Sequence, residues 1–301
     1  MTVVASAPGK IVLSGEYAVL DGKPAISMAV DRRAVVTLED TPDDECKLST
    51  PGFTGDDGYR IVDAVCGSSR PARNIVLDTR AFADDGSKIG LGSSAALTVA
   101  LVAGLSESEA VLSEALLAHR AFQGGAGSGV DVATAVRGGL VEFEMLSGAV
   151  TSLSWPAGLC MRVIWTGVPA STEAKLEKLA AQVARPSRSA LLLAAARMAK
   201  AWRSGDADRI MADYIPYIGV LRQFSVDHDL GIFDAGHDQL TDAAMLGDLV
   251  YKPAGAGGGD IGILFGKDAA ELDRFIAGHS DMIHGVLQCA LDPVGVRVLC
   301  R

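Results

Sequence analysis

The sequence predicts an α+β protein with two domains, and three observations indicate this architecture. The chain has 301 residues, which is more than a typical single domain contains. Hydrophobic residues make up 49% of it and charged residues 21%, a composition that supports a buried core. Stretches typical of strands and of helices alternate without the regular spacing of a doubly wound parallel sheet. We expect a boundary near Pro156, giving domains of residues 1–157 and 158–301.

The expected elements follow from local sequence patterns. Short β-rich runs bounded by turn residues predict strands, and apolar residues at helical spacing predict helices. The acidic, glycine-rich stretch 40–60 predicts a solvated loop. The expected strands are residues 3–5, 11–13, 25–30, 34–38, 140–143, 153–155, 161–165, 261–265 and 294–299, with Ala7-Pro8-Gly9 as an interruption between the first two. The expected helices are residues 94–105, 109–122 and 269–277, and most of 173–226 with a break at 185–187.

The charge balance limits the partners of this protein. The formal net charge is −10, and no block of Lys or Arg stands out. This argues against nucleic acid or an anionic membrane surface as the main partner, but a small anionic substrate stays compatible with it. The most apolar stretch, Ala95–Leu105, is too short to span a bilayer.

The cysteines and the N-terminal residues bear on the compartment. Five scattered cysteines without a C-x-x-C motif predict free thiols in a reducing environment. Ala5-Ser6-Ala7 resembles a signal-peptidase site, but no charged and apolar regions precede it. We therefore expect a cytoplasmic protein, as a monomer or homodimer.

A glycine- and serine-rich segment predicts a phosphate-binding loop. It reads KIGLGSSAA over residues 88–96 and runs directly into a helix. Glycines let the backbone approach a ligand closely, and a helix N-terminus offers free N–H groups and a positive dipole end. Hydroxyls of Ser93 and Ser94 can reach phosphate or Mg²⁺, and Lys88 adds a cation. The structural alternative is an ordinary Gly-Ser turn with a serine N-cap.

The same segment formally matches a dinucleotide fingerprint, Gly90-x-Gly92-x-x-Ala95. That fingerprint needs a strand directly before it and an acidic residue about twenty residues further on, near the end of the next strand. Here an acidic turn precedes the segment, and the acids that follow fall at a helix junction. The sequence therefore disfavours an NAD site. It also lacks the G-x-x-x-x-G-K-[ST] motif of the P-loop enzymes.

Two further glycine-rich loops carry candidate functional residues. Residues 123–131 end in Asp131, the one acidic residue between Glu114 and Glu142. An Asp there can accept a proton, orient an acceptor or hold a metal, or it can simply cap the next helix. Residues 252–260 contain more glycine and alanine than a hairpin turn requires, which favours close approach to a ligand.

Together these loops resemble the three motifs of the GHMP kinases, the family of galactokinase and of homoserine, mevalonate and phosphomevalonate kinases. Residues 7–19, APGKIVLSGEYAV, are similar to the first motif, Gly90–Ala96 to the second and Gly255–Asp260 to the third. All three occur in the family's order. The resemblance implies an α+β fold with a ribosomal-protein-S5-like N-terminal domain, a ferredoxin-like C-terminal domain and ATP in the cleft between them.

Finer details are similar to the phosphomevalonate kinase branch of the family. They are the segments 119–133, 165–172 and 252–260. Mevalonate kinases tend to have a magnesium-binding Glu where this chain has Gly125. The branch implies transfer of the γ-phosphate of ATP to (R)-5-phosphomevalonate. The stretch between the first two motifs is shorter than in that branch, so mevalonate or another hydroxyl acceptor stays open.

The resemblance implies specific roles. Lys10 stabilises charge near the γ-phosphate, Mg²⁺ lies near Ser94, and Asp131 acts on the acceptor. A hydroxyl acceptor needs a base, whereas a phosphate with a second pKa of about 6 is already anionic, so that Asp131 then orients it or tunes Lys10. The expected ATP-binding residues are Lys88, Gly90, Leu91, Gly92, Ser93, Ser94 and Ala95.

A phosphorylated acceptor also needs cations and hydroxyl donors. Each candidate has a structural alternative: Ser171 or Thr172 suits a helix N-cap, and His119 can simply pack. The expected substrate-binding residues are His119, Ser128, Gly129, Arg137, Ser171, Thr172, Lys252, Ala256 and Gly257, with Arg120 as a further cation.

Other readings of the sequence remain. A fold-related decarboxylase phosphorylates its substrate and then eliminates CO₂. A nucleotide-binding regulator without catalysis is a different class, against which the presence of Lys10, Ser94 and Asp131 argues. An NAD-linked reductase would bind its cofactor without affinity for ATP.

Overall fold

The computed structural model describes residues 2–42, 45–52, 55–67, 69–84, 87–106, 110–183 and 185–300. The protein has the expected α+β fold. Its residues pack as two compact units, and each is built from segments distant in sequence. Unit 1 consists of Met1–Ile11, Ser27–Val141 and Ala290–Arg301, and unit 2 of Val12–Ile26 and Glu142–Cys289. These units are defined by packing, so the division at 157/158, defined by position along the chain, stays a prediction.

The main sheet has the strand order β13-β1-β2-β4-β3, and β7 also pairs with β2 and β8 with β7. Strands β1, β2 and β7 contribute residues to both units. The sheet is antiparallel at β1–β13 and β2–β4, and parallel at β3–β4. Its strands are β1 (Thr2–Ser14), β2 (Ala25–Asp40), β3 (Lys47–Ser49), β4 (Arg73–Asp78), β7 (Leu140–Glu144), β8 (Ala149–Leu153) and β13 (Arg297–Cys300).

The first strand corrects a prediction, because Ala7-Pro8-Gly9 does not interrupt it. β1 is continuous from Thr2 to Ser14. Gly9 lets the strand pack closely against its neighbours, since a Cβ there would lie 2.6 Å from the ring of Phe82 and 2.7 Å from the carbonyl oxygen of Leu91. A glycine can thus indicate a near neighbour as well as a turn.

The second strand corrects another prediction, because the two expected strands 25–30 and 34–38 form one strand, β2. The charged residues between them stay in the strand because they have partners. The guanidinium of Arg33 donates to the carboxylate of Asp292 and to the carbonyl oxygens of Ser6 and Gly295, all within unit 1.

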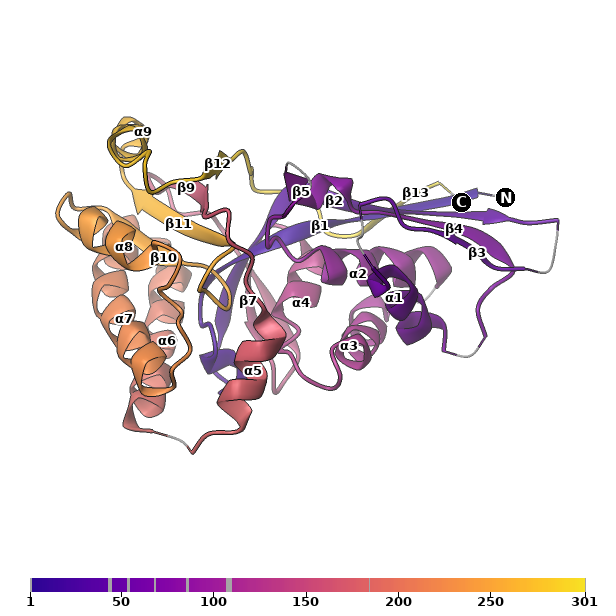
Figure 1. Ribbon diagram of the computed structural model, residues 1–301, viewed down its shortest axis with the longest axis horizontal. Coiled ribbons are helices and arrows are strands. Elements are labelled where there is room, and N and C mark those ends of the chain that lie inside the picture. Colours follow the sequence, from indigo (N-terminus) through magenta and orange to yellow (C-terminus); the bar gives the residue numbers. More distant parts are fainter. Residues whose placement is uncertain are drawn as a thin grey trace. The chain divides into compact units, whose positions relative to one another are not determined.

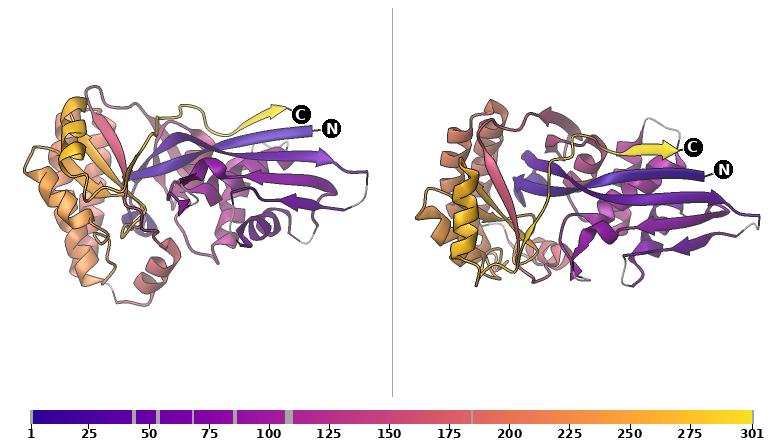
Figure 2. Two further views of the ribbon diagram at one scale, coloured as in Figure 1. Left: turned by 45° about the horizontal axis from the view of Figure 1, so that its top comes forward. Right: turned by 90° about the horizontal axis from the view of Figure 1, so that it is seen from above.

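Four helices of unit 1 cover one face of its sheet (Figures 1 and 2). α2 is the central one: eleven of its residues are buried, and it contacts each of the other three. The expected helices 94–105 and 109–122 are confirmed as α2 and α3. The helices are α1 (Asp57–Cys66), α2 (Ser93–Leu105), α3 (Val111–Phe122) and α4 (Val130–Arg137).

The stretch 40–60 is more structured than its composition predicts. It contains β3 and the start of α1, whose apolar residues Ile61 and Val62 are fully buried. Its residues 43, 44, 53 and 54 lie outside the part of the chain that the structure describes. Short elements beyond this stretch are η2 (Arg80–Phe82) and the paired strands β5 (Ala83–Asp84) and β6 (Ser87–Lys88).

Unit 2 contains an antiparallel sheet of order β10-β11-β9-β12. The expected strands 161–165 and 261–265 and the expected helix 269–277 are confirmed. The segment 173–226 is mostly helical, as expected, but its helices are Thr172–Ala180, Pro186–Ser204 and Ala207–Asp227, so Pro186 and Ser187 of the expected break lie inside a helix. The expected strand 153–155 lies too far along the chain, because β8 spans Ala149–Leu153 and ends before Pro156. The elements are η1 (Ala18–Asp21), β9 (Cys160–Trp165), α5 (Thr172–Ala180), α6 (Pro186–Ser204), α7 (Ala207–Asp227), α8 (His237–Met245), β10 (Val250–Pro253), β11 (Ile261–Gly266), α9 (Ala269–Gly278) and β12 (Gly285–Leu287).

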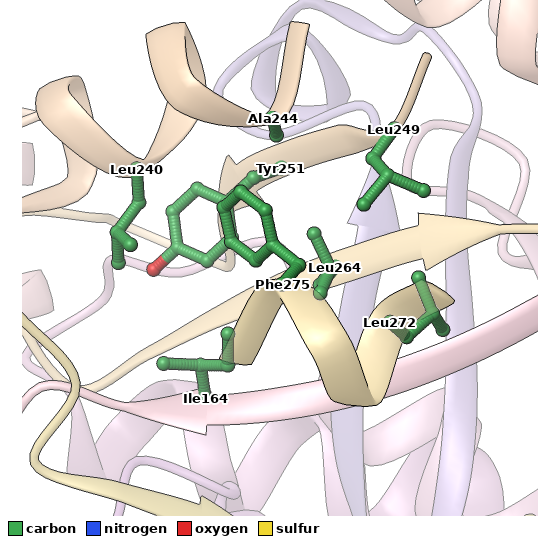
Figure 3. Close-up of a cluster of buried hydrophobic side chains, with 8 residues drawn as sticks. All are labelled: Ile164, Leu240, Ala244, Leu249, Tyr251, Leu264, Leu272 and Phe275. Carbon is green, nitrogen blue, oxygen red and sulfur yellow. The ribbon is translucent and has the colours of Figure 1, made fainter. Parts of the chain in front are cut away.

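Helices cover both faces of this second sheet. A cluster of eight buried side chains fills one face (Figure 3), and they come from α8, α9, three strands and Leu249 directly before β10. On the other face Phe265 contacts Trp202 of α6 and Tyr214 of α7, with ring centroids 6.1 Å and 5.2 Å away. The strand β10 is therefore buried along its whole length, so its polar residues need partners inside the unit.

Two general expectations can be compared with these elements. All five cysteines are free thiols, as predicted. Within the described ranges, no helix is both long enough and apolar enough to cross a membrane.

Candidate active site

The loop before α2 has the backbone geometry of an anion-binding site. Gly90 and Gly92 have φ values of 73° and 78°, in the left-handed region that favours glycine. Gly92 is the N-cap of α2, and no side chain caps this helix end. The alternative of a serine N-cap is therefore wrong. The N–H groups of Ser93, Ser94 and Ala95 begin a helix of 13 residues, whose dipole favours an anion here.

Lys10 of β1 lies directly against this loop. Its backbone N–H donates to the carbonyl oxygen of Leu91 at 2.8 Å. Its side chain runs over Gly92, where an added Cβ would lie 3.0 Å from Cε and 3.1 Å from Cγ of the lysine. Gly92 thus provides both the left-handed turn and the space for Lys10. The structure brings together the lysine and the loop that the sequence predicted to act on one triphosphate.

His119 of α3 contacts the same helix end. It is 1% exposed, and its Nε2 lies 3.2 Å from the hydroxyl of Ser94. Phe122 stacks on its ring, with centroids 5.8 Å apart. These contacts favour a role for His119 in orienting Ser94 over the predicted contact with the acceptor.

The second glycine loop leads into α4. Gly129 is the N-cap with φ 81°, and Asp131 lies in the first turn. Oδ1 of Asp131 accepts the N–H of Val132 at 3.0 Å, and the hydroxyl of Ser128 accepts the N–H of Val130 at 3.3 Å. The carboxylate of Asp131 is half-buried, so it satisfies one N–H while an oxygen can still reach a ligand.

A magnesium ion fits the donor groups of unit 1. Mg²⁺ prefers hard oxygen ligands and usually takes only one or two from the protein, the others coming from phosphates and water. Ser94 supplies a hydroxyl and Asp131 a carboxylate of that kind. The described residues contain no group of three or more His, Cys, Asp or Glu that could form an all-protein metal site. This donor set suits a metal that arrives with a triphosphate.

Lys88, Arg120 and Arg137 are the exposed cations among the predicted residues of unit 1, and Arg120 lies in the last turn of α3. Lys88 is the last residue of β6, opposite Ala83. Arg137 is the last residue of α4, where its charge suits the negative end of the helix dipole. None of these three positions contradicts the predicted binding role, which stays a prediction.

Lys252 has a partner that the sequence did not indicate. Its side chain is fully buried in unit 2, and its ammonium group forms an ion pair with the carboxylate of Glu16. The hydroxyl of Tyr217 donates to the other oxygen of Glu16 at 2.6 Å and accepts the N–H of Gly15 at 2.9 Å. Burial raises the pKa of Tyr217 well above its usual value. This neutralised cluster favours a structural role for Lys252 over the predicted binding of a substrate phosphate.

The third glycine loop, residues 254–260 of unit 2, contains the predicted site residues Ala256 and Gly257. The carbonyl oxygen of Ala256 accepts the hydroxyl of Tyr17 at 2.7 Å. Gly257 has φ 69°, and a Cβ there would lie 2.5 Å from the carbonyl oxygen of Ile232. This loop therefore requires glycine for its conformation and for its close packing.

The loop between β9 and α5 is tied to the third glycine loop by Asp260. The N–H of Asp260 donates to the carbonyl oxygen of Val168 at 2.6 Å, and its Oδ1 accepts the N–H of Ala170 at 3.2 Å. Ser171 is the N-cap of α5, and its hydroxyl accepts the N–H of Ala174 at 3.2 Å. Thr172 is the exposed first residue of that helix. The N-cap alternative for Ser171 is thus confirmed.

Sequence reasoning missed several polar residues that organise these loops. Glu16 lies inside the first motif and received no role. His237, Tyr217 and Asp260 each form hydrogen bonds with a motif residue, but their partners are far away in sequence. These residues can be recognised because each is a polar residue that packs beside a glycine-rich motif. That proximity is known only once the fold is known.

Comparisons with known proteins agree with this geometry. The model of the GHMP kinases N terminal domain matches residues 74–139. A phosphomevalonate kinase of Streptomyces sp. (strain CL190) is 31% identical over 340 residues, covering 87% of this chain and 89% of that protein. A mevalonate kinase of Methanothermobacter thermautotrophicus is 34% identical, but over 46% of this chain and 50% of that protein.

A solved structure matches the whole fold. It is that of Streptococcus pneumoniae phosphomevalonate kinase in complex with phosphomevalonate and AMPPNP, with a TM-score of 0.77. The match covers 98% of this chain and 99% of that one at 18% identity, which supports the fold alone. With the nearly full-length relative, it follows that the chain belongs to the GHMP kinase family. It is a phosphotransferase with the two-domain α+β fold of that family.

Proposed function

We propose that this protein transfers the γ-phosphate of ATP to the phosphate group of (R)-5-phosphomevalonate, giving 5-diphosphomevalonate for isoprenoid synthesis. The observation that carries the proposal is the similarity to the Streptomyces phosphomevalonate kinase over 87% of the chain. The neighbour with the same fold was solved with phosphomevalonate and AMPPNP, which are the proposed acceptor and an analogue of the proposed donor. The cytoplasmic location and the monomeric or homodimeric state stay predictions.

The residues of unit 1 suit the donor half of this reaction. The free N–H groups at the start of α2 bind the phosphates of ATP, and Lys10 stabilises charge on the γ-phosphate. Ser94, oriented by His119, provides a hydroxyl for Mg²⁺, which when bound neutralises phosphate charge. Catalysis of phosphoryl transfer depends on such positioning and charge neutralisation more than on covalent chemistry.

The acceptor decides what Asp131 does. An oxygen of the acceptor phosphate bonds to the γ-phosphorus while the bond from that phosphorus to the β,γ-bridging oxygen breaks, and ADP leaves. Because the second pKa of a phosphate is about 6, this oxygen is already anionic at neutral pH. Asp131 then orients the acceptor or tunes Lys10. With a hydroxyl acceptor it would take the proton instead.

A second candidate acceptor is mevalonate, which the 34% identity to an archaeal mevalonate kinase favours. This relative matches less than half of the chain. The acceptor would then be uncharged at the reacting oxygen, so Asp131 would be needed as a base.

The test is ADP release coupled to an NADH assay, with ATP and Mg²⁺ against mevalonate, phosphomevalonate, homoserine and simple sugars. We expect turnover with phosphomevalonate, with a kcat/KM at least about a hundredfold above that for mevalonate, because a site that pairs a phosphate discriminates strongly against an analogue without it. Turnover with another acceptor alone would contradict the proposed acceptor. A CO₂ assay excludes the decarboxylase, and ATP binding without any turnover would favour a regulator.

A further inference from the structure

His237, the first residue of α8, has a fully buried side chain that bridges two groups of unit 2. Its Nε2 lies 3.1 Å from the carbonyl oxygen of Gly259, and its Nδ1 lies 2.8 Å from the hydroxyl of Tyr251. A carbonyl oxygen can only accept a hydrogen bond, so Nε2 carries the proton. The hydroxyl of Tyr251 then donates to Nδ1. The two contacts fix a single neutral tautomer of the ring.

The surroundings keep this imidazole uncharged. Burial, the main cause, lowers the pKa of His237 to about 4. The hydrogen bond to Gly259 and the charge of Asp234 raise this pKa, whereas the charges of Lys252 and Lys175 lower it. At neutral pH the ring therefore acts as a fixed donor to Gly259 and carries no charge of its own.

The peptide group that receives this hydrogen bond is held on both sides. Its carbonyl oxygen, from Gly259, accepts from His237, and its N–H, from Asp260, donates to the carbonyl oxygen of Val168 at 2.6 Å. A peptide group is planar, so the two contacts together fix its orientation. Asp260 has φ 54°, an unusual value for a residue with a side chain, which this double anchorage stabilises.

The turn before α8 supports the same loop. The N–H of Gly258 donates to the carbonyl oxygen of Ile232 at 2.7 Å. A Cβ at Gly259 would lie 2.5 Å from the carbonyl oxygen of Val168, so this position requires glycine and packs closely against residues 166–171. His237 is thus the side-chain anchor on one side of a closely packed loop. Tyr251, which orients its ring, belongs to the apolar cluster of this unit (Figure 3).

We propose that His237 is a positioning residue, which holds the third glycine loop and the neighbouring loop 166–171 in the conformation that binds the acceptor. The proposal rests on the proposed function and on the predicted binding of the acceptor by Ala256, Gly257, Ser171 and Thr172 at these loops. Without the imidazole, the carbonyl oxygen of Gly259 is left buried and unpaired, and the loop must rearrange to satisfy it. Acceptor binding then weakens, while the groups that bind ATP in unit 1 keep all their contacts.

Three variants of the full-length enzyme test this role. His237→Ala removes the donor, and His237→Gln restores one, since a glutamine amide N–H can reach the position of Nε2. His279→Gln is the matched control. The Nδ1 of His279 also contacts a backbone carbonyl oxygen, that of Phe275 at 2.8 Å, but on α9 and not on the loop.

We expect the KM for phosphomevalonate to rise about tenfold or more in His237→Ala, as loss of a hydrogen bond to a buried carbonyl suggests. The KM for ATP should stay within about twofold, because differential effects on two substrates report the site that changed. The Gln variant should recover most of the acceptor affinity, and His279→Gln should match the wild type.

Other outcomes would overturn the proposal. Equal loss in the Ala and Gln variants, or a parallel rise of both KM values, would indicate general structural damage. An unchanged acceptor KM in His237→Ala would remove the positioning role. If the wild type uses a different acceptor from the panel, the proposed function fails, and the same comparison with that acceptor still decides the role of His237.

A spectroscopic readout does not depend on activity or on the folding of a variant. Nitrogen-15 NMR of the wild type should show one histidine that is neutral and protonated at Nε2 at pH values down to about 5. For His237 itself, a neutral ring protonated at Nδ1, or titration near the usual pKa of histidine, would contradict the geometry from which the proposal starts.

Discussion

At the scale of single residues, the carboxylate of Asp131 is the group on which the proposed chemistry depends most. Its Oδ1 accepts the N–H of Val132 in the first turn of α4. Asp131→Asn keeps an oxygen for this N–H and removes only the charge. We expect kcat to fall by roughly a hundredfold or more, a usual effect of losing a group that acts on the acceptor. ATP affinity, measured by calorimetry, should stay near that of the wild type.

Asp63→Asn is the control for this variant. Asp63 is an exposed carboxylate of α1 in the same unit, ion-paired with Arg70 at 2.5 Å. Its substitution should leave kcat unchanged. If Asp131→Asn turns over as fast as this control, the carboxylate only stabilises the start of α4 and the predicted catalytic role is wrong.

Residue roles could be predicted where the reason lies within a motif, and not where it lies in a distant partner. The loop from Gly90 to Ala95 begins a helix with free N–H groups because of its local sequence, so its geometry followed from the sequence. Lys252 looked like a substrate cation because it stands beside a glycine loop. Its ion pair with Glu16, more than two hundred residues away, gives it another role. No local pattern contains that information.

At the scale of elements, Gly92 at the start of α2 is required for two reasons, its backbone conformation and its close contact with Lys10. Gly92 has φ 78° and lies against the side chain of Lys10. Gly92→Ala introduces backbone strain and also displaces the lysine. We expect ATP to bind at least about tenfold more weakly, since one disturbed contact of a charged group is worth 1.5–3 kcal/mol. The measurement is calorimetric titration with ATP and Mg²⁺.

Gly205→Ala is the control for Gly92→Ala, because it introduces the same kind of backbone strain without displacing a neighbouring side chain. Gly205 is the C-cap of α6 with φ 67°, and a Cβ there would have nothing within 4 Å. Both variants should lose about 1 kcal/mol of unfolding free energy, the usual penalty of alanine at a left-handed position. Only Gly92→Ala should lose ATP affinity. Equal ATP binding by the two variants would refute the coupling between loop and lysine.

Element prediction succeeded where periodicity was clear and failed where charged or small residues stayed inside a strand. The apolar period of α2 and α3 identified both helices. β1 and β2 were each divided at residues that usually end strands, Ala7-Pro8-Gly9 and the charged run around Arg33. Tertiary contacts override these local preferences, since Gly9 is needed for packing and Arg33 donates to Ser6, Asp292, Val294 and Gly295 of unit 1.

At the scale of the whole molecule, His237 makes stability depend on pH. Its pKa is about 4 in the folded protein and about 6.5 in an unfolded chain. Between these pH values the unfolded state binds more protons than the folded state. The contribution of neutral His237 to the unfolding free energy is therefore fully present above about pH 6.5 and decreases as the pH falls toward 4. The full contribution is about 3 kcal/mol, from 1.36 kcal/mol for each pKa unit.

Urea unfolding of the wild type and of His237→Gln at about pH 7, 5.5 and 4.5 measures this effect. The glutamine does not titrate, so the unfolding free energy of the variant should fall less on acidification than that of the wild type. Parallel curves would show that the imidazole is already charged, or free to charge, in the folded protein.

The strand β13 has a consequence for how the protein is made. It pairs with the beginning of β1, and Asp292 and Gly295 just before it satisfy Arg33. Residues 290–300 must therefore leave the ribosome before the sheet of unit 1 can close, after all of unit 2 has been translated. Domains usually fold in the order of their synthesis. Here the unit begun first is finished last, so the edge of β1 in the nascent chain stays unpaired, and open to chaperones or to wrong partners, until residues 297–300 have been synthesised.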